Sequence, residues 1–379
     1  MPEAQLSGSP REDLDEILTK RRTATDSALQ DHVDRIVAGC LTALPDARAL
    51  ILYGSYGRGE GAWFEDDGGS FRPYNDYDVL IVADRTLPKR ELDELKQGLL
   101  REIGLRWLDI GQKSPAQLRR LRPSILNHDL KYASRVIHGD TTVLDLIPDI
   151  PASSLPMKDA QTLYFTRLWT FLGSLPPGGV DQNLAGDCAR FFRNQMSKAV
   201  LAVVDVVLLA HGAYDTSYRT RVDRLASLHP EEAALLKLSS WALQEKLVPS
   251  APVMNASEVC DLYEAVLQQY RRQMYRALGH HFGRPIRGPE DLERALRWRP
   301  VSLLRRAFWL ARFRDSLMEK RLDIQLAQSY LVAAYGDDAR SEPRLARATR
   351  LLRSLDHSLP TALCWNDARV AAAKLRMEL

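Results

Sequence analysis

The sequence predicts an α+β protein, in which a small mixed-sheet domain is followed by an all-α helical bundle domain. Short aliphatic runs alternate with helical patterns up to about residue 140, whereas helical periodicity is found almost everywhere from Met157 onward. A proline-rich stretch between them, Ile147–Pro156, is the best linker candidate. We therefore expect a disordered N-terminus at residues 1–10, a first domain at 11–150 and a helical domain at 157–379, which could consist of two subdomains and would close the acceptor side.

The composition indicates an ordinary soluble globular protein. The chain has 379 residues, of which 45% are hydrophobic and 27% charged, enough for two or three domains with cores of their own. Its net charge of +3 is too small to indicate a partner by itself. The four cysteines lie far apart without a CxxC pair, which argues against a disulfide framework and a structural zinc site and suits a reducing cytoplasm.

No segment has the pattern of a signal peptide or a membrane span. Residues 1–15 are polar and acidic. The most apolar segment, Ala199–Ala210, is about half the roughly 20 residues that a spanning helix requires, and it contains Asp205. We expect a buried helix there, no transmembrane segment and a cytoplasmic protein.

The expected elements follow in chain order. One or two helices are expected between Arg11 and Leu44, ending near Pro45. Strands are then expected at Ala49–Tyr53, Asp76–Ala83 and Leu105–Ile110, with a short edge strand at Arg135–Gly139. Helices are expected at Pro88–Ile103 and at Gln117–Tyr132, the latter interrupted at Pro123. This alternation gives a small α/β or α+β domain. The helical half shows no fixed repeat, so a bundle is favoured over a solenoid.

Two carboxylates, Asp76 and Asp78, stand two residues apart at the start of the second strand. Alternation along a strand points both to one face, where two such charges repel each other unless a cation lies between them. Oxygen ligands favour magnesium. Asp109 lies near the end of the third strand, which could lie beside this pair. The alternative for the pair alone is a solvated strand end.

A glycine-rich turn directly follows the first strand. Gly54 and Ser55 free backbone N–H groups to point at an anion, and the glycines that follow let the chain approach a ligand closely. Arg58 can neutralise phosphate charge, and Glu60 lies in the same candidate nucleotide-binding loop. By itself such a loop is most often an ordinary turn; followed by three acids, it indicates a nucleotide and metal site.

The combination Gly-Ser, Asp-x-Asp and a later Asp resembles the DNA polymerase β-like nucleotidyltransferase superfamily. The form Gly54-Ser55-Tyr56-Gly57-Arg58-Gly59-Glu60 is similar to that of bacterial protein uridylyl- and adenylyltransferases. Aminoglycoside and minimal nucleotidyltransferases belong to the same superfamily, and the former carry a helical domain behind the catalytic one. The motifs span Leu52 to about Asp140.

The resemblance implies a role for each motif residue. Gly54 and Ser55 would hold the β and γ phosphates of ATP or another nucleoside triphosphate. Asp76 and Asp78 would bind two Mg²⁺ ions, with Mn²⁺ as an alternative, and Asp109 would bind the catalytic ion and help to deprotonate the acceptor hydroxyl. In-line attack on the α-phosphorus would then release pyrophosphate.

Two features depart from this family. Residues 62–74 form a longer gap than usual before the acidic pair. A surface insertion is favoured there, and an aromatic hairpin or lid is the alternative. The His-Asp metal-hydrolase domain of bacterial uridylyltransferases has no counterpart, since the triplet Asn127-His128-Asp129 is too isolated to serve. Lys131 and Ser134 could contact the triphosphate, as residues after the third strand do in some relatives, or mark an exposed helix end.

A basic and aromatic region, Arg271–Arg314, stands out in the helical half. It contains twelve arginines with aromatic residues between them, but only three acids. Such a region could bind a polyanion, or its arginines could pair with acids elsewhere in the bundle. Arg276 and His281 have a spacing seen in helical ribonuclease domains, but His280 and His281 fit equally a helix C-terminus before Gly283.

The sequence thus predicts transfer of a nucleoside monophosphate to a hydroxyl of a small-molecule acceptor, with AMP as the favoured nucleotide. One alternative is transfer to a macromolecule, by protein AMPylation or UMPylation or by RNA or tRNA modification. The other is a binding module that keeps the fold and has lost the chemistry. The presence of all three acids argues against the last of these.

Overall fold

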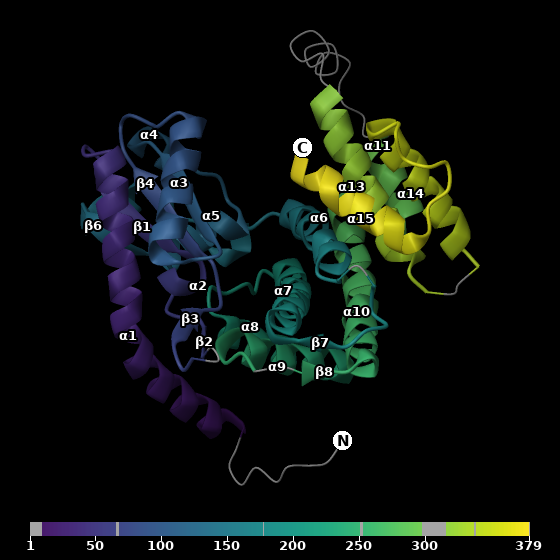
Figure 1. Cartoon of the computed structure of the whole chain (residues 1–379), viewed down its shortest axis with the longest axis horizontal. Coiled ribbons are helices and arrows are strands. Elements are labelled where there is room, and N and C mark those ends of the chain that lie inside the picture. The colour runs from purple at the N-terminus through teal and green to yellow at the C-terminus, as the bar shows by residue number, and fades with distance from the viewer. Residues whose placement is uncertain are drawn as a thin grey trace. The chain divides into compact units, whose positions relative to one another are not determined.

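A computed structural model describes residues 10–65, 68–176, 178–250, 253–297, 316–336 and 339–378, with the backbone alone at 10–24, 316–318 and 378 (Figure 1). The chain combines a small mixed sheet with many helices, as expected for an α+β protein. It forms two compact units. The first contains the described residues of Met1–Pro156 and His211–Ala251, and the second those of Met157–Ala210 and Pro252–Leu379.

A four-stranded sheet in the order β5-β4-β1-β6 forms the centre of the first unit. Strand β1 pairs antiparallel with β4 and β6, whereas β4 pairs parallel with β5, so the sheet is mixed. The strands are β1 Ala49–Tyr53, β4 Tyr77–Val82, β5 Leu108–Lys113 and β6 Arg135–Gly139. All four expected strands are present, and β6 lies at an edge as predicted.

The third strand begins three residues later than the expected Leu105–Ile110. Helix α3, Lys89–Ile103, ends at Gly104 in the left-handed conformation, and the N–H of Leu105 still bonds to the carbonyl of Leu100 at 3.1 Å. Leu105 therefore completes the helix terminus before the strand can begin.

Helices α1, Pro10–Ala43, and α3 cover one face of this sheet (Figure 1). Ile36 from α1 and Leu99 from α3 share a buried core with Tyr77, Val79 and Ile81 of β4. Because successive side chains of a strand point to opposite faces, the intervening positions of β4 point away from these two helices. Residues 1–9, nearly all of the segment expected to be disordered, lie outside the described residues, and Pro10 begins α1 as a single helix.

Shorter elements complete the first unit. They are α2 Gly54–Gly57, a hairpin of β2 Trp63–Glu65 and β3 Phe71–Pro73, α4 Pro115–Leu118, α5 Ile125–Tyr132, the 3-10 helices η1 Thr141–Leu146 and η2 Ala152–Ser154, α8 Tyr218–Leu228 and α9 Ala233–Leu247. The last two differ from the sequence-based division, which placed all of 157–379 in one helical domain; they group with the sheet.

The second unit is almost entirely helical. Its elements are α6 Lys158–Gly173, β7 Leu184–Ala185, α7 Gly186–Ala210, β8 Val253–Met254, α10 Ala256–Phe282, α11 Pro289–Arg297, α13 Ser316–Ala334, α14 Ser341–Leu355 and α15 Trp365–Glu378. The expected buried helix at Ala199–Ala210 is the second half of α7, and α10 ends after His280 and His281 at a left-handed Gly283. Among the described helices, none is both long and apolar enough to cross a membrane.

Candidate active site

The acidic residues expected to form a site come from two neighbouring strands. Asp78 of β4 is paired in register with Asp109 of the parallel strand β5. Paired residues on adjacent strands lie about 5 Å apart and project to the same face. Asp76 directly precedes the first residue of β4 and lies two positions before Asp78. The expectation that the third strand lies beside the carboxylate pair is confirmed.

Tyr53, the last residue of β1, completes this row across the sheet. It is paired with Asp78 on the other side of β4. Burial raises the pKa of its phenol, and the negative charges of Asp78 and Asp109 raise it further. The pKa of the Tyr53 phenol is therefore raised by both aspartates, which shows that the electrostatic potential at this position is negative. A bound cation would neutralise it.

Gly54 brings the glycine turn into contact with Asp78. Its backbone has a φ of +66°, a conformation that residues with a side chain rarely adopt. A Cβ atom on Gly54 would lie 2.1 Å from Oδ2 of Asp78, so there is no room for one. Both the backbone and the carboxylate therefore require glycine at this position. Ser55 follows within α2 and is buried.

Lys96 of α3 binds the third acid. Its Nζ lies 2.7 Å from Oδ1 of Asp109, whose side chain is 63% exposed. Strand β5 is an edge strand, so a long side chain on α3 can reach Asp109 around the edge of the sheet. This contact takes up one oxygen of a candidate metal ligand, and no pattern in the sequence indicates it.

The acids of this face have the donor chemistry that magnesium prefers, since all are carboxylates on adjoining positions. Asp76 and Asp78 would hold such an ion between β4 and the glycine turn. No three histidine, cysteine, aspartate or glutamate side chains converge into a ready cage among the residues that the structure describes. Asp109 could join Asp76 and Asp78 as a ligand only if its contact with Lys96 were replaced by one with the ion.

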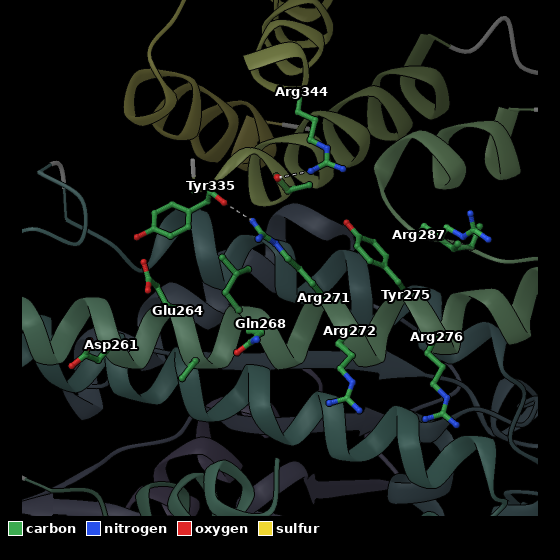
Figure 2. Close-up of a pocket in the computed structure, with 15 residues that line it drawn as sticks. Asp261, Glu264, Gln268, Arg271, Arg272, Tyr275, Arg276, Arg287, Tyr335 and Arg344 are labelled. Carbon is green, nitrogen blue, oxygen red and sulfur yellow. Dashed lines mark hydrogen bonds between the residues drawn. The ribbon is translucent and has the colours of Figure 1, made fainter. Parts of the chain in front are cut away.

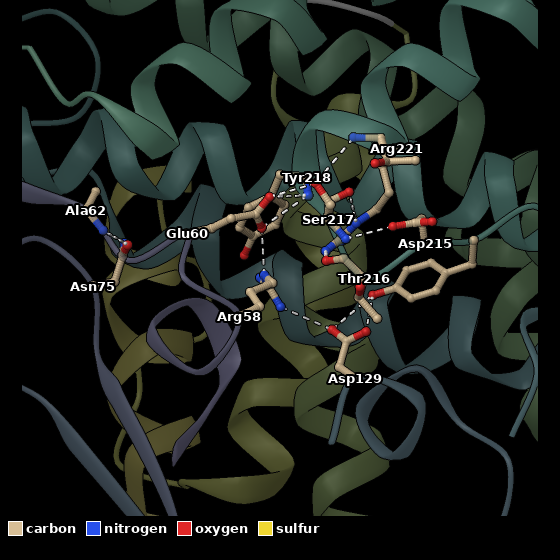
Figure 3. A network of polar contacts seen from close by, with 12 residues as sticks. Arg58, Glu60, Ala62, Asn75, Asp129, Asp215, Thr216, Ser217, Tyr218 and Arg221 are labelled. Atoms are coloured by element: carbon tan, nitrogen blue, oxygen red, sulfur yellow. Dashed lines mark hydrogen bonds and ion pairs between the residues drawn. The ribbon is translucent and has the colours of Figure 1, made fainter. Parts of the chain in front are cut away.

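The remaining loop residues lie in a polar network rather than on the surface (Figure 3). The Arg58 side chain is only 8% exposed; its Nε lies 2.8 Å from Glu60 and its Nη1 3.3 Å from Asp129. Burial opposes its charge, but Tyr218, Asp129 and Glu60 outweigh this and raise the pKa of Arg58. A phosphate bound by Arg58 would have to replace one of these carboxylates.

Glu60 connects the glycine loop to helix α8. Its Oε1 accepts hydrogen bonds from the Ser217 hydroxyl at 2.8 Å and the Tyr218 backbone N–H at 3.0 Å (Figure 3). A carboxylate at a helix N-terminus is favourable because it meets unpaired N–H groups and the positive end of the helix dipole. Arg58 lies over the Tyr218 ring at 4.2 Å. The loop is therefore held by residues more than 150 positions away in sequence.

Asp129, the last residue of the Asn127-His128-Asp129 triplet, belongs to the same network. Both of its carboxylate oxygens accept from the Tyr214 hydroxyl at 3.1 Å, and one meets Arg58. The neighbouring His128 bonds to the carbonyl of Ile150 at 2.7 Å. These contacts give both residues a structural role in joining α5 to its surroundings.

The other two residues predicted to contact phosphate, Lys131 and Ser134, donate hydrogen bonds to backbone carbonyls. Lys131 donates from Nζ to the carbonyl of Leu144 at 2.9 Å, and the Ser134 hydroxyl donates to the carbonyl of Leu130. Both side chains are thus engaged at the end of α5, in keeping with the helix-end alternative, and their contact with a triphosphate stays a prediction.

The insertion before the acidic pair contains a hairpin, whereas the sequence favoured a surface insertion over this arrangement. Strands β2 and β3 pair antiparallel, and Trp63 is buried against Tyr56. The Tyr74 hydroxyl donates to Glu245 of α9 at 2.8 Å. At its base, the buried side chain of Asn75 accepts from the N–H of Ala62 at 3.0 Å, which holds the hairpin next to Asp76.

The predicted basic region is only partly described, since residues 298–315 lie outside the described ranges. Within it, Arg294 pairs with Asp291, and Arg297 pairs with Glu293 and Asp323. These arginines follow the alternative of pairing within the bundle. Arg276 is exposed on α10 and lines a cavity together with four other arginines.

Comparison with known protein families finds none that matches this chain, and no curated protein matches it in sequence.

Proposed function

We propose that this protein is a magnesium-dependent nucleotidyltransferase that moves a nucleoside monophosphate, AMP from ATP, to a hydroxyl group of a small-molecule acceptor. The observation that carries the proposal is the pairing of Asp78 with Asp109 next to Gly54, whose absent side chain makes room for the Asp78 carboxylate. An ordinary turn after a strand has no need of this contact.

The glycine turn and the three acids each have a proposed task. The N–H groups of Gly54 and Ser55 bind the β and γ phosphates, since they open a helical turn directly after β1. Asp76 and Asp78 hold magnesium, which when bound neutralises the triphosphate and stabilises the attacking and leaving oxygens. Asp109 would join them as a magnesium ligand once it gives up its contact with Lys96, and it accepts the proton of the acceptor hydroxyl.

The reaction balances as a simple displacement. The deprotonated hydroxyl oxygen forms a bond to the α-phosphorus, the bond from that phosphorus to the bridging oxygen of the β-phosphate breaks, and pyrophosphate leaves with the negative charge. The protein contributes by positioning and by charge stabilisation, which dominate phosphoryl chemistry generally. The buried network of Arg58 and Glu60 supports this by holding the loop rigid.

The test uses ATP labelled either on the α or on the γ phosphate, with magnesium and three acceptor pools: a protein-free metabolite fraction, total RNA and the protein itself. We expect α label on a small molecule, γ label in pyrophosphate, and neither transfer in EDTA. Label on RNA or protein would change the acceptor and leave the chemistry intact. Transfer of γ label to an acceptor, or transfer unaffected by Asp76→Ala, would overturn the proposal.

A further inference from the structure

A cavity of about 1060 Å³ lies in the second unit, between α10, the segment before α11, the end of α13 and α14 (Figure 2). Its volume is at the upper end of the range for small-molecule sites. Five arginines line it against two acids, Asp261 and Glu264. All lining residues belong to the second unit, so the cavity shares no residue with the candidate active site.

Three of the five arginines lie toward one end. Arg272 and Arg276 project from successive turns of α10, whereas Asp261 and Glu264 lie toward the other end of that helix (Figure 2). Arg287 approaches from the segment before α11. The cavity therefore has a cationic end and an acidic end, which would orient a ligand of matching polarity.

Two of these arginines have guanidinium groups without a partner among the described residues. Neither Arg276 nor Arg287 forms an ion pair or a side-chain hydrogen bond there, and both are exposed. This distinguishes them from nearby Arg294 and Arg297, which pair with acids. Because nothing among the described residues engages these two guanidinium groups, they can bind an anion from solution.

A third arginine lies deeper in the wall and lacks a carboxylate partner. Arg271 donates from Nη2 to the carbonyls of Val332 and Tyr335, and its Nε has no hydrogen-bond partner among the residues described. Burial lowers the pKa of Arg271. A partly buried cation that meets only carbonyl dipoles is costly, and an anion nearby would offset that cost.

The guanidinium fork donates paired hydrogen bonds to the oxygens of a phosphate or a carboxylate. Several arginines along one cavity supply charge for a ligand with more than one such group. The tyrosines Tyr275 and Tyr335 also line the cavity and offer flat apolar surface (Figure 2). A nucleic-acid strand would need an extended basic track, whereas these groups line a single cavity.

We infer that this cavity binds a small molecule carrying at least two phosphate groups, held by Arg272, Arg276 and Arg287. It is a second anion site that does not depend on the proposed transferase reaction. The acidic end favours a ligand whose other end bears hydroxyl or amino groups.

Tripolyphosphate is the probe, titrated calorimetrically into the full-length protein in EDTA, so that magnesium-dependent binding elsewhere does not contribute. We expect saturable binding that weakens about tenfold in Arg276→Ala and in Arg287→Ala, because each removes charged hydrogen bonds to the ligand. Arg284→Ala is the matched control, since Arg284 is exposed close by and does not line the cavity. Asp78→Asn, in the other unit, should bind as the wild type does.

Three outcomes would overturn the inference: no binding of tripolyphosphate, equal binding by the Arg276 and Arg284 variants, or loss of binding in Asp78→Asn alone. Binding of an RNA oligonucleotide without binding of tripolyphosphate would also contradict it. Circular dichroism of each variant verifies that weaker binding does not come from unfolding.

Discussion

Gly54 and Asp78 lie so close that a single methyl group on Gly54 would overlap the Asp78 carboxylate, 2.1 Å from its Oδ2. The contact joins the glycine turn to the acidic strand within one site. Several consequences of this arrangement can be measured.

Gly54→Ala should abolish nucleotidyl transfer. The change strains a backbone at φ +66° by about 1–2 kcal/mol and also displaces Asp78. Gly59→Ala is the matched control, because Gly59 has a φ of +77° but nothing within 4 Å of an added Cβ. It should show the strain in its urea unfolding midpoint while keeping most of the activity. Equal activities of the two variants would mean that the Asp78 contact is unimportant.

Lys96→Ala should lower the magnesium concentration needed for half-maximal activity. Lys96 and magnesium compete for Asp109, and removing the lysine frees the carboxylate. The pair is largely exposed, so the free energy of unfolding should fall by no more than about 1 kcal/mol. Lys96→Arg keeps the charge and should behave as the wild type does. A higher magnesium requirement in Lys96→Ala would instead mean that the lysine positions Asp109 for binding.

Glu60→Gln should loosen the start of α8. The change weakens bonds to Ser217, Tyr218 and Arg58, each partly buried, and we expect a loss of about 2 kcal/mol in local stability. Hydrogen exchange of the α8 backbone amides measures this directly. In the control, Glu94→Gln, the exposed Arg90–Glu94 pair is lost, with side chains 89% and 62% exposed, so a change below about 0.5 kcal/mol is expected. Unchanged exchange in α8 would refute the connection.

Acid should destabilise the second unit partly through Glu293. Burial alone would raise the pKa of this carboxyl, but hydrogen bonds from Arg347, Tyr330 and Arg297 outweigh it and lower the pKa to about 2. As the pH falls, Glu293 is therefore protonated earlier in the unfolded chain, where its pKa has the ordinary value of 4.5, than in the folded protein. The resulting stability is fully present above that pH and is lost as the pH falls toward 2.

Thermal unfolding from pH 6 to pH 3 measures this effect. The melting temperature of Glu293→Gln should fall less steeply below pH 4.5 than that of the wild type. Arg347→Met removes one partner and should show part of the same flattening. Parallel curves for all three proteins would exclude Glu293 as a source of the pH dependence.

Local patterns in the sequence were sufficient for most of the fold of the first unit. The aliphatic run Ala49–Tyr53 is β1 without a shift, because a buried strand flanked by turn residues has a clear signal. The third strand was misplaced since Leu105 is apolar like a strand residue but closes the preceding helix. The neighbourhood of Asp78 and Asp109 was also predictable, from strand order and spacing.

Long-range side-chain contacts could not be predicted. Glu60 and Ser217 are 157 residues apart, and no periodicity or motif relates them. Nor does any pattern show that Lys96 turns toward Asp109, because that contact depends on how α3 packs beside an edge strand. For the same reason the sequence placed α8 and α9 with the helical half, although their contacts are with the sheet-bearing unit.

The most direct test is magnesium-dependent release of pyrophosphate from ATP, compared between the wild type, Asp78→Asn and Asp84→Asn in the presence of the metabolite fraction that accepts label. Asp84 follows the same strand but pairs with Arg48 at an exposed position. We predict a loss of at least about a hundredfold in Asp78→Asn and no change in Asp84→Asn. Equal release by the wild type and Asp78→Asn would contradict the account.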